Sequence, residues 1–130
     1  MERSEAYQRG AALRSEMQGE EYARQRDGDT YADPTTQKFI DAATELVFGQ
    51  LWTRPGLDLK TRSLVVLVSD VACGTEEIAI HLRMALRQGW TEDEIAEAYL
   101  QLMGYVGAPL IRQAFLRSQP VFQEFRTKRA

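Results

Sequence analysis

Residues 64–68 form the longest uninterrupted apolar run in the sequence, Leu-Val-Val-Leu-Val, and this run constrains the fold more than any other feature. It lies in a stretch that begins at Asp58, a residue suited to cap the start of a helix, and ends at Gly74, a residue suited to end one. The stretch is longer than the four to eight residues typical of a buried strand. We therefore predict a central helix over residues 58–73, apolar on every side at its middle.

Caps and helical spacing recur in the following segments. Thr75 is placed to cap a helix that Gly89 ends, and Thr91 with Glu94 forms a capping box at the start of another. Pro109 is suited to begin a last helix, which Pro120 should kink or split. No segment has the pattern of a strand with a partner. The sequence predicts an all-α fold, a bundle of about six helices.

The segments before residue 58 divide into an arm and the start of the body. A polar helix with few apolar residues is expected from Glu2 to about Arg26, followed by turn-forming residues up to Pro34. Asp33 and Pro34 then begin an amphipathic helix that should stop near Trp52. We predict one domain over residues 1–130, with an N-terminal arm at 1–33 and a helical body at 34–130. The arm needs a neighbouring surface, so an oligomer is expected.

Composition excludes several classes of function. The formal net charge of −3 provides no basic surface for a nucleic acid, so a small molecule is the expected partner. A single cysteine rules out an intramolecular disulfide and a cysteine-rich zinc site. The N-terminus lacks the apolar segment of a signal peptide, and no apolar run is long enough to cross a membrane. We expect a cytoplasmic protein with no membrane partner.

Glu77 and His81 are the first candidates for catalysis. They are four residues apart, which places them on one helix face about 40° apart around the axis. Histidine exchanges a proton near neutral pH, and a carboxylate one turn away can orient its ring, so the pair suits a proton donor and its partner. An exposed helix pair with a purely structural role is the alternative. Metal binding is not expected, because two ligands are too few and the chain has no second histidine.

Four further residues are candidates for the same site. Arg54 and Arg62 flank the Pro55-Gly56 turn and are suited to hold a carboxylate by two hydrogen bonds, with solvated charges as the alternative. Trp52 and Tyr105 are candidates for the wall of a cavity, with a place in the core as the alternative.

Cys73 is the only cysteine, and it has no companion at Cys-x-x-Cys spacing. It is expected to be a small buried hydrophobic residue rather than a redox group.

A long string of residues resembles the carboxymuconolactone decarboxylase family. With x for any residue, the string begins Phe48-Gly49-x-Leu51-Trp52-x-Arg54-Pro55-Gly56-Leu57-Asp58-x-Lys60-Thr61-Arg62-Ser63-Leu64. It continues as Glu77-Ile78-x-x-His81-x-Arg83-x-Ala85-Leu86-x-x-Gly89, Thr91-x-x-Glu94-Ile95-x-Glu97 and Tyr105-x-Gly107-x-Pro109. The related AhpD-like thiol peroxidases share this fold, but their two cysteine positions hold Gly74 and Glu77 here. Thiol peroxidase chemistry is therefore not expected.

The resemblance implies an AhpD-like helical fold, a trimer or hexamer, and a carboxy-lyase that needs no cofactor. The reaction would convert 4-carboxymuconolactone to 3-oxoadipate enol-lactone, or a related lactone, in the beta-ketoadipate pathway of aromatic catabolism. In this interpretation His81 donates the proton and Glu77 orients its ring. Arg54 or Arg62 holds a carboxylate or the dienolate oxygen, Trp52 forms a wall, and Tyr105 contacts the substrate.

The chain departs from the family's pattern at three places, and these bear on the substrate. They are Tyr22, where a histidine is common, Asp70, which interrupts an otherwise apolar helix, and Leu110 to Arg112, where small residues are common. Two alternatives therefore stay open. One is other lactone or decarboxylation chemistry in a different pathway, and the other is an oligomeric small-molecule-binding protein without catalysis.

Overall fold

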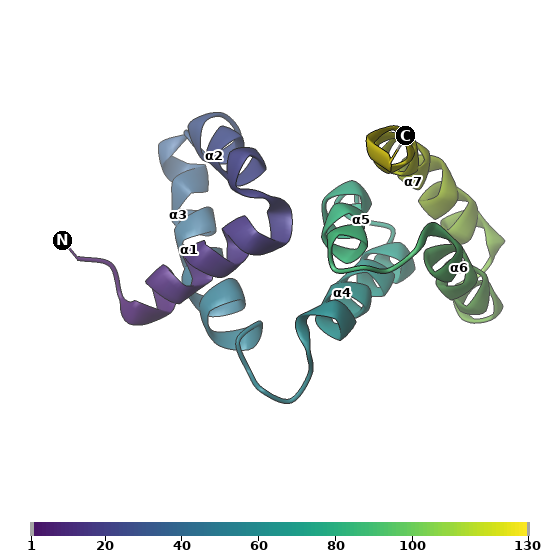
Figure 1. Cartoon of the computed structure of the whole chain (residues 1–130), viewed down its shortest axis with the longest axis horizontal. Helices are drawn as coiled ribbons and strands as arrows, with labels where there is room; N and C mark the ends of the chain where they lie inside the picture. Colours follow the sequence, from purple (N-terminus) through teal and green to yellow (C-terminus); the bar gives the residue numbers. More distant parts are fainter. Residues whose placement is uncertain (1, 130) are drawn as a thin grey trace. The chain divides into compact units, whose positions relative to one another are not determined.

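The computed structural model describes residues 2–129, and this part of the chain contains helices and no strand (Figure 1). The all-α prediction is confirmed. The elements are α1 (Glu5–Gln18), α2 (Glu20–Gly28), α3 (Pro34–Ala43), the π-helix η1 (Thr44–Leu51), α4 (Leu59–Cys73), α5 (Ile78–Arg87), α6 (Glu92–Val106) and α7 (Ala108–Arg129). They form two compact units, of which the first ends at Leu57 and the second begins at Asp58. The division does not follow the expected arm and body, and a single functional domain stays a prediction.

In the first unit, the single helix predicted for the N-terminal arm is divided into two, α1 and α2. The break lies at Gly19, whose φ of 97° is a backbone conformation that glycine adopts without steric cost. Its amide nitrogen donates to the carbonyl of Ser15 and closes the last turn of α1. The expectation of one helix to Arg26 was wrong because the spacing of apolar residues in this polar segment is too sparse to reveal the break.

The helix expected from Pro34 to Trp52 begins as predicted but changes its geometry midway. Asp33 caps α3 by accepting from the amides of Thr35 and Thr36, and α3 gives way to η1 at Thr44. The hydroxyl of Thr44 donates to the carbonyl of Ile40 at 2.6 Å. Here α1 packs directly on η1, with glycines at the contact. Sequence spacing cannot reveal a π-helix, because its apolar positions differ from those of an α-helix by a fraction of a turn.

The second unit is built from α4, α5, α6 and α7 around one apolar core. Its fully buried members come from all four helices: Leu67, Val71, Ile78, Leu82, Ala85, Ile95, Tyr99, Ile111, Ala114 and Val121. The predicted cap at Asp58 and capping box at Thr91 are present. Gly74 ends α4 in the left-handed conformation, with a φ of 68°. Of the apolar middle of α4, Leu67 is fully buried, whereas Val65 is 52% exposed within the chain.

Two boundaries in the second unit differ from the sequence predictions. Thr75 does not cap α5, which begins at Ile78 with Glu77 at the N-cap position. Instead Arg117 of α7 donates to the carbonyl of Thr75 at 2.7 Å and fixes the turn that leads to Glu77. The predicted split of the last helix does not occur. Helix α7 continues through Pro120, which lies on an exposed part of the helix. Among the described residues, no helix is long and apolar enough to span a bilayer.

Candidate active site

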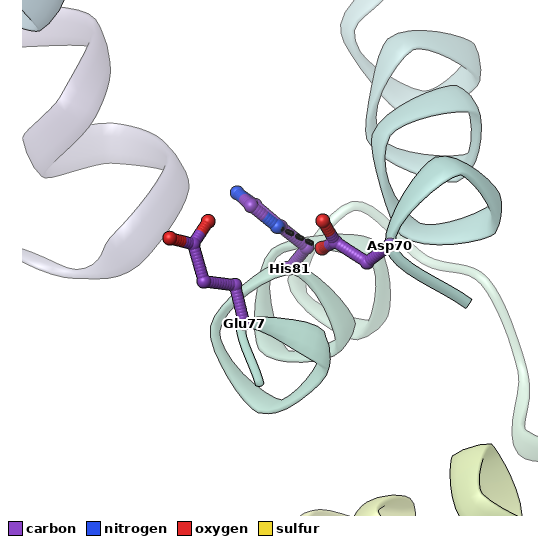
Figure 2. A group of neighbouring side chains, drawn as sticks. All are labelled: Asp70, Glu77 and His81. Atoms are coloured by element: carbon purple, nitrogen blue, oxygen red, sulfur yellow. Dashed lines mark hydrogen bonds and ion pairs between the residues drawn. The ribbon is translucent and has the colours of Figure 1, made fainter. Parts of the chain in front are cut away.

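Asp70, Glu77 and His81 form a cluster where α4 meets α5 in the second unit (Figure 2). Asp70 lies in the last turn of α4, Glu77 at the N-cap of α5, and His81 in the first turn of α5. One nitrogen or oxygen atom from each of the three side chains lies within 4.8 Å of the other two. The cluster is a small acidic site around the chain's one histidine.

A hydrogen bond joins Nδ1 of His81 to Oδ2 of Asp70. The two residues are eleven positions apart, so the bond links two helices rather than two turns of one helix. It fixes the imidazole relative to α4 as well as α5. The side chain of His81 keeps 18% of its surface exposed and that of Asp70 keeps 11%, so the ring is held in place while part of its surface stays exposed.

Glu77 does not make the contact with the His81 ring that was expected of it. Its spacing from His81 predicted that Glu77 orients the ring, but the ring is hydrogen-bonded to Asp70. In Figure 2 Glu77 and Asp70 flank the imidazole, with Glu77 on the side away from α4. Glu77 is exposed, and its carbonyl accepts from the amide of His81 at 3.2 Å as the first turn of α5 forms. It remains a proposed member of the site.

Asp70 is the site residue that sequence reasoning missed, although the signal was present. An acidic residue in an apolar helix is costly unless it has a hydrogen-bond partner, and a partner in the fold was therefore to be expected. Asp70 is 8% exposed in the structure, and His81 supplies that partner. In the sequence, Asp70 stood out as a departure from the family's pattern and was not assigned to the site.

The negative charge of Asp70 affects the pKa of Tyr99, a residue in the core of the second unit. The pKa of Tyr99 is raised to about 12, chiefly by burial and also by the negative charge of Asp70, while the hydrogen bond with Ser118 acts in the opposite direction. The Tyr99 hydroxyl lies 2.8 Å from Oγ of Ser118, and its ring meets that of Phe115 edge to face. The acidic end of the cluster therefore adjoins the apolar core.

The other candidate residues lie at separate places. Arg62 lies three residues into α4 and is half-buried, in the same unit as the cluster. Arg54 and Trp52 belong to the first unit, where Arg54 is exposed and Trp52 is buried with its ring stacked on Phe48. Tyr105 near the end of α6 is 81% exposed. The structure thus brings Glu77 and His81 together with Asp70, while the substrate-binding roles of these four residues stay predictions.

Cys73 is exposed in the last turn of α4. The expectation that it is buried was wrong, because Cys73 lies on an exposed side of the last turn, whereas Asp70 and Val71 in the same turn are buried. Its one-residue offset from the thiol peroxidase positions remains, so the expectation of no redox role is unchanged.

The departures at Leu110 and Arg112 lie on a groove along α7. This groove has a volume of about 570 Å³ and is lined by Pro109, Leu110, Arg112, Gln113, Leu116 and Arg117. The side chain of Leu110 also lies against Gly74, at the turn between α4 and α5. A change at Leu110 can therefore act on the turn that leads to Glu77.

The cluster also has the composition of a metal site, since Asp70, Glu77 and His81 could each offer one ligand atom. The Nδ1 atom of His81 already makes a hydrogen bond with Asp70, so a metal ion bound at that nitrogen would have to replace the bond. The expectation of no metal and no cofactor stays a prediction.

Comparison with known proteins identifies the family. The model of the carboxymuconolactone decarboxylase family matches residues 37–117, more than half of the chain and all three residues of the cluster. The chain belongs to the carboxymuconolactone decarboxylase family. This confirms the resemblance drawn from the motif string, including the segments around Arg62 and His81.

Two relatives that match over most of their length are decarboxylases. The 4-carboxymuconolactone decarboxylase of Acinetobacter baylyi is 33% identical over 125 residues, which cover 95% of this chain and 92% of the relative. The nitrosuccinic acid decarboxylase npaB of Metarhizium robertsii is 33% identical over 121 residues, which cover 91% and 82%. An uncharacterised 15.0 kDa protein of Paracoccus denitrificans is 34% identical over 83 residues, or 62% of each chain. The first two relatives differ in substrate and share loss of a carboxyl group.

Proposed function

We propose that this protein is a decarboxylase in which His81 delivers a proton to a substrate carbon after CO2 has left. One observation carries the proposal: the chain's one histidine is fixed by a carboxylate on a second helix and still keeps part of its surface exposed. A general acid needs this combination of fixed orientation and access to the substrate. Membership of a family with decarboxylase relatives supports the same reaction class.

The two relatives' substrates have a chemical feature in common. In 4-carboxymuconolactone the carboxyl group that leaves is attached to a ring carbon conjugated through the alkene to the lactone carbonyl. In nitrosuccinic acid one carboxyl group shares its carbon with the nitro group. In both, the electrons of the broken bond can move onto oxygen atoms of the substrate, and a second carboxylate is retained. We therefore propose a dicarboxylate with such an electron-accepting group as the substrate class.

The reaction is balanced without a cofactor. The carbon–carbon bond to the carboxylate breaks, CO2 leaves, and the electron pair moves into the lactone or nitro group. His81 then gives its proton to a carbon of the resulting anion and regains one from water. That carbon is the one next to the carbonyl in the lactone, and the one that lost CO2 in the nitro compound. The protein has to bind the carboxylates, stabilise the negative oxygen and place the proton donor, which are tasks for side chains alone.

The neighbouring residues have proposed roles in this scheme. Asp70 and Glu77 place two carboxylates beside the imidazole, and Asp70 is hydrogen-bonded to its Nδ1 atom. Arg62 or Arg54 holds a substrate carboxylate by two hydrogen bonds. Trp52 and Tyr105 are proposed to wall the substrate when the protein is assembled.

The two substrates serve as alternative tests, since the two relatives are equally identical to this chain. The purified protein is incubated with 4-carboxymuconolactone, nitrosuccinate or succinate, and CO2 release is followed against blanks without protein. We expect one of the first two to be turned over and succinate, which has no electron-accepting group, to remain intact. Turnover of 4-carboxymuconolactone would place the protein in aromatic catabolism. Binding of both without CO2 release would favour a binding protein instead.

We further propose that the protein is a homo-oligomer, a trimer or a hexamer as the family resemblance implies. Each unit leaves large apolar side chains uncovered, and such surfaces usually mark an interface. They are Phe39, Leu46, Val47, Leu51 and Leu57 in the first unit, and Val65, Leu100, Met103, Tyr105 and Leu116 in the second. Light scattering at micromolar concentration should give a multiple of 14.8 kDa, and a monomer would contradict the proposal.

A further inference from the structure

We infer that Asp70 is a positioning residue that keeps a proton on Nδ1 of His81 and so makes Nε2 the atom that exchanges a proton with the substrate. The inference rests on the proposed function only for what the Nε2 proton does in the reaction. The protonation pattern itself follows from the hydrogen bond between the two side chains.

The chemistry of the two partners fixes which nitrogen carries the hydrogen. An ionised carboxylate accepts hydrogen bonds and donates none, so the hydrogen between Asp70 and His81 belongs to Nδ1. A neutral imidazole has one N–H group, and with that group on Nδ1 the Nε2 atom is bare. When the ring is protonated, Nε2 carries the second hydrogen. Nδ1 therefore stays occupied in both states, and only Nε2 gains and loses a proton.

Asp70 is better placed than Glu77 to hold the ring in one protonation pattern, because Asp70 is buried and Glu77 is exposed. Asp70 is held in an ordered turn of α4 with 8% of its surface exposed, in an environment where a hydrogen bond to a charged group is strengthened. Glu77 is exposed, and its side chain has the freedom of a helix start. A covered carboxylate in an apolar helix also needs the N–H group of His81 as its partner, so the bond serves both residues.

The arrangement suits the proposed proton transfer. During the reaction the Nε2–H bond breaks as the new C–H bond forms, and the imidazole becomes neutral with its hydrogen on Nδ1. No rotation of the ring and no proton movement between its nitrogens is then needed before Nε2 takes a proton from water. Without Asp70, the neutral ring is free to adopt the form with hydrogen on Nε2, which the side chain of free histidine prefers in water.

The test uses the fact that His81 is the chain's one histidine, so its ring resonances need no assignment. The protein is labelled with ¹⁵N, and two-bond ¹H–¹⁵N spectra are recorded without substrate while the pH is raised until the ring signals stop moving, with folding followed by circular dichroism. We expect the Nδ1 resonance in the protonated range and Nε2 in the unprotonated range. The opposite pattern in the wild type would overturn the inference without any variant.

Two variants separate Asp70 from Glu77. Asp70→Leu removes the acceptor while keeping an apolar helix former in α4, and we expect the hydrogen to move to Nε2. Glu77→Gln is the matched control, and we expect it to keep the wild-type pattern. If Asp70→Leu keeps the hydrogen on Nδ1, or if Glu77→Gln moves it, then Asp70 does not set the proton's place. These results need no turnover, so a failed substrate assay would leave them intact.

Discussion

Gly10 of α1 and Gly49 of η1 lie where the backbones of two helices touch. A Cβ atom built on Gly10 would lie 2.8 Å from the amide nitrogen of Gly49 and 1.9 Å from the carbonyl oxygen of Thr44. A Cβ atom on Gly49 would lie 2.1 Å from the carbonyl oxygen of Ala6. All of these neighbours are backbone atoms, which cannot move aside without separating the helices.

We expect Gly10→Ala to lower the free energy of unfolding by roughly 1–3 kcal/mol, the usual cost of an overpacked contact, in spite of the higher helix propensity of alanine. Gly28→Ala in the same unit is the control, because nothing lies within 4 Å of the place that its new methyl group would take and its φ is not positive. Urea unfolding followed by circular dichroism measures both. Equal stability of the two variants would show that α1 and η1 are not in contact through Gly10.

Tyr99 should make stability fall at high pH. Its pKa is raised from 10.0 to about 12 in the folded protein, so between these values the folded state holds a proton that the unfolded state has lost. The contribution of Tyr99 to the free energy of unfolding is therefore fully present below pH 10 and is lost as the pH rises towards 12. A pKa difference of this size corresponds to roughly 2–3 kcal/mol.

Tyr99→Phe removes this titration. At neutral pH the variant should be less stable by about 1 kcal/mol, because the buried Ser118 hydroxyl loses its partner. Between pH 10 and pH 12 its stability should fall less than that of the wild type, in urea titrations at each pH. Parallel curves for the two proteins would mean that Tyr99 does not titrate as described.

Cys73 should be dispensable. Its thiol is exposed at the end of α4 and lies outside the cluster, so Cys73→Ala should change the free energy of unfolding by no more than about 0.5 kcal/mol. CO2 release should proceed at the wild-type rate. Loss of turnover with the fold intact would assign the thiol a catalytic role that this account does not give it.

If Arg62 holds a substrate carboxylate, its replacement should weaken substrate binding more than it slows the reaction. Arg62→Lys keeps the charge but cannot make two parallel hydrogen bonds, and losing one such bond to a carboxylate costs roughly 1.5–3 kcal/mol. We expect KM to rise about 10- to 100-fold with a smaller change in kcat. Arg54→Lys, measured alongside, shows which arginine holds the substrate. If neither variant changes KM, the clamp lies elsewhere.

The local signals in the sequence predicted much of the second unit. Asp58, Thr91 and Gly74 determine helix ends through their own side chains or backbone freedom, so the residues that end α4 and begin α6 could be recognised without tertiary contacts. The pair of Glu77 and His81 followed from spacing in the same way. Such features depend on neighbours in the chain alone.

The features that were missed depend on contacts between distant residues. The hydrogen bond from His81 to Asp70 joins two helices, and spacing within one helix favoured Glu77 instead. The carbonyl of Thr75 is fixed by Arg117, which is distant in sequence, so the start of α5 did not follow the local capping pattern. The change from α3 to η1 at Thr44 likewise accompanies the packing of α1.

The central claim is that His81 delivers the proton to the substrate carbon. The most direct measurement is kcat for CO2 release from the substrate that is turned over, 4-carboxymuconolactone in the first instance, with wild type, His81→Ala and Glu77→Gln compared without added metal. General acid catalysis contributes ~100- to 10,000-fold, so His81→Ala should lower kcat by that range with little change in KM, and Glu77→Gln should cost less. A wild-type kcat for His81→Ala would contradict the account.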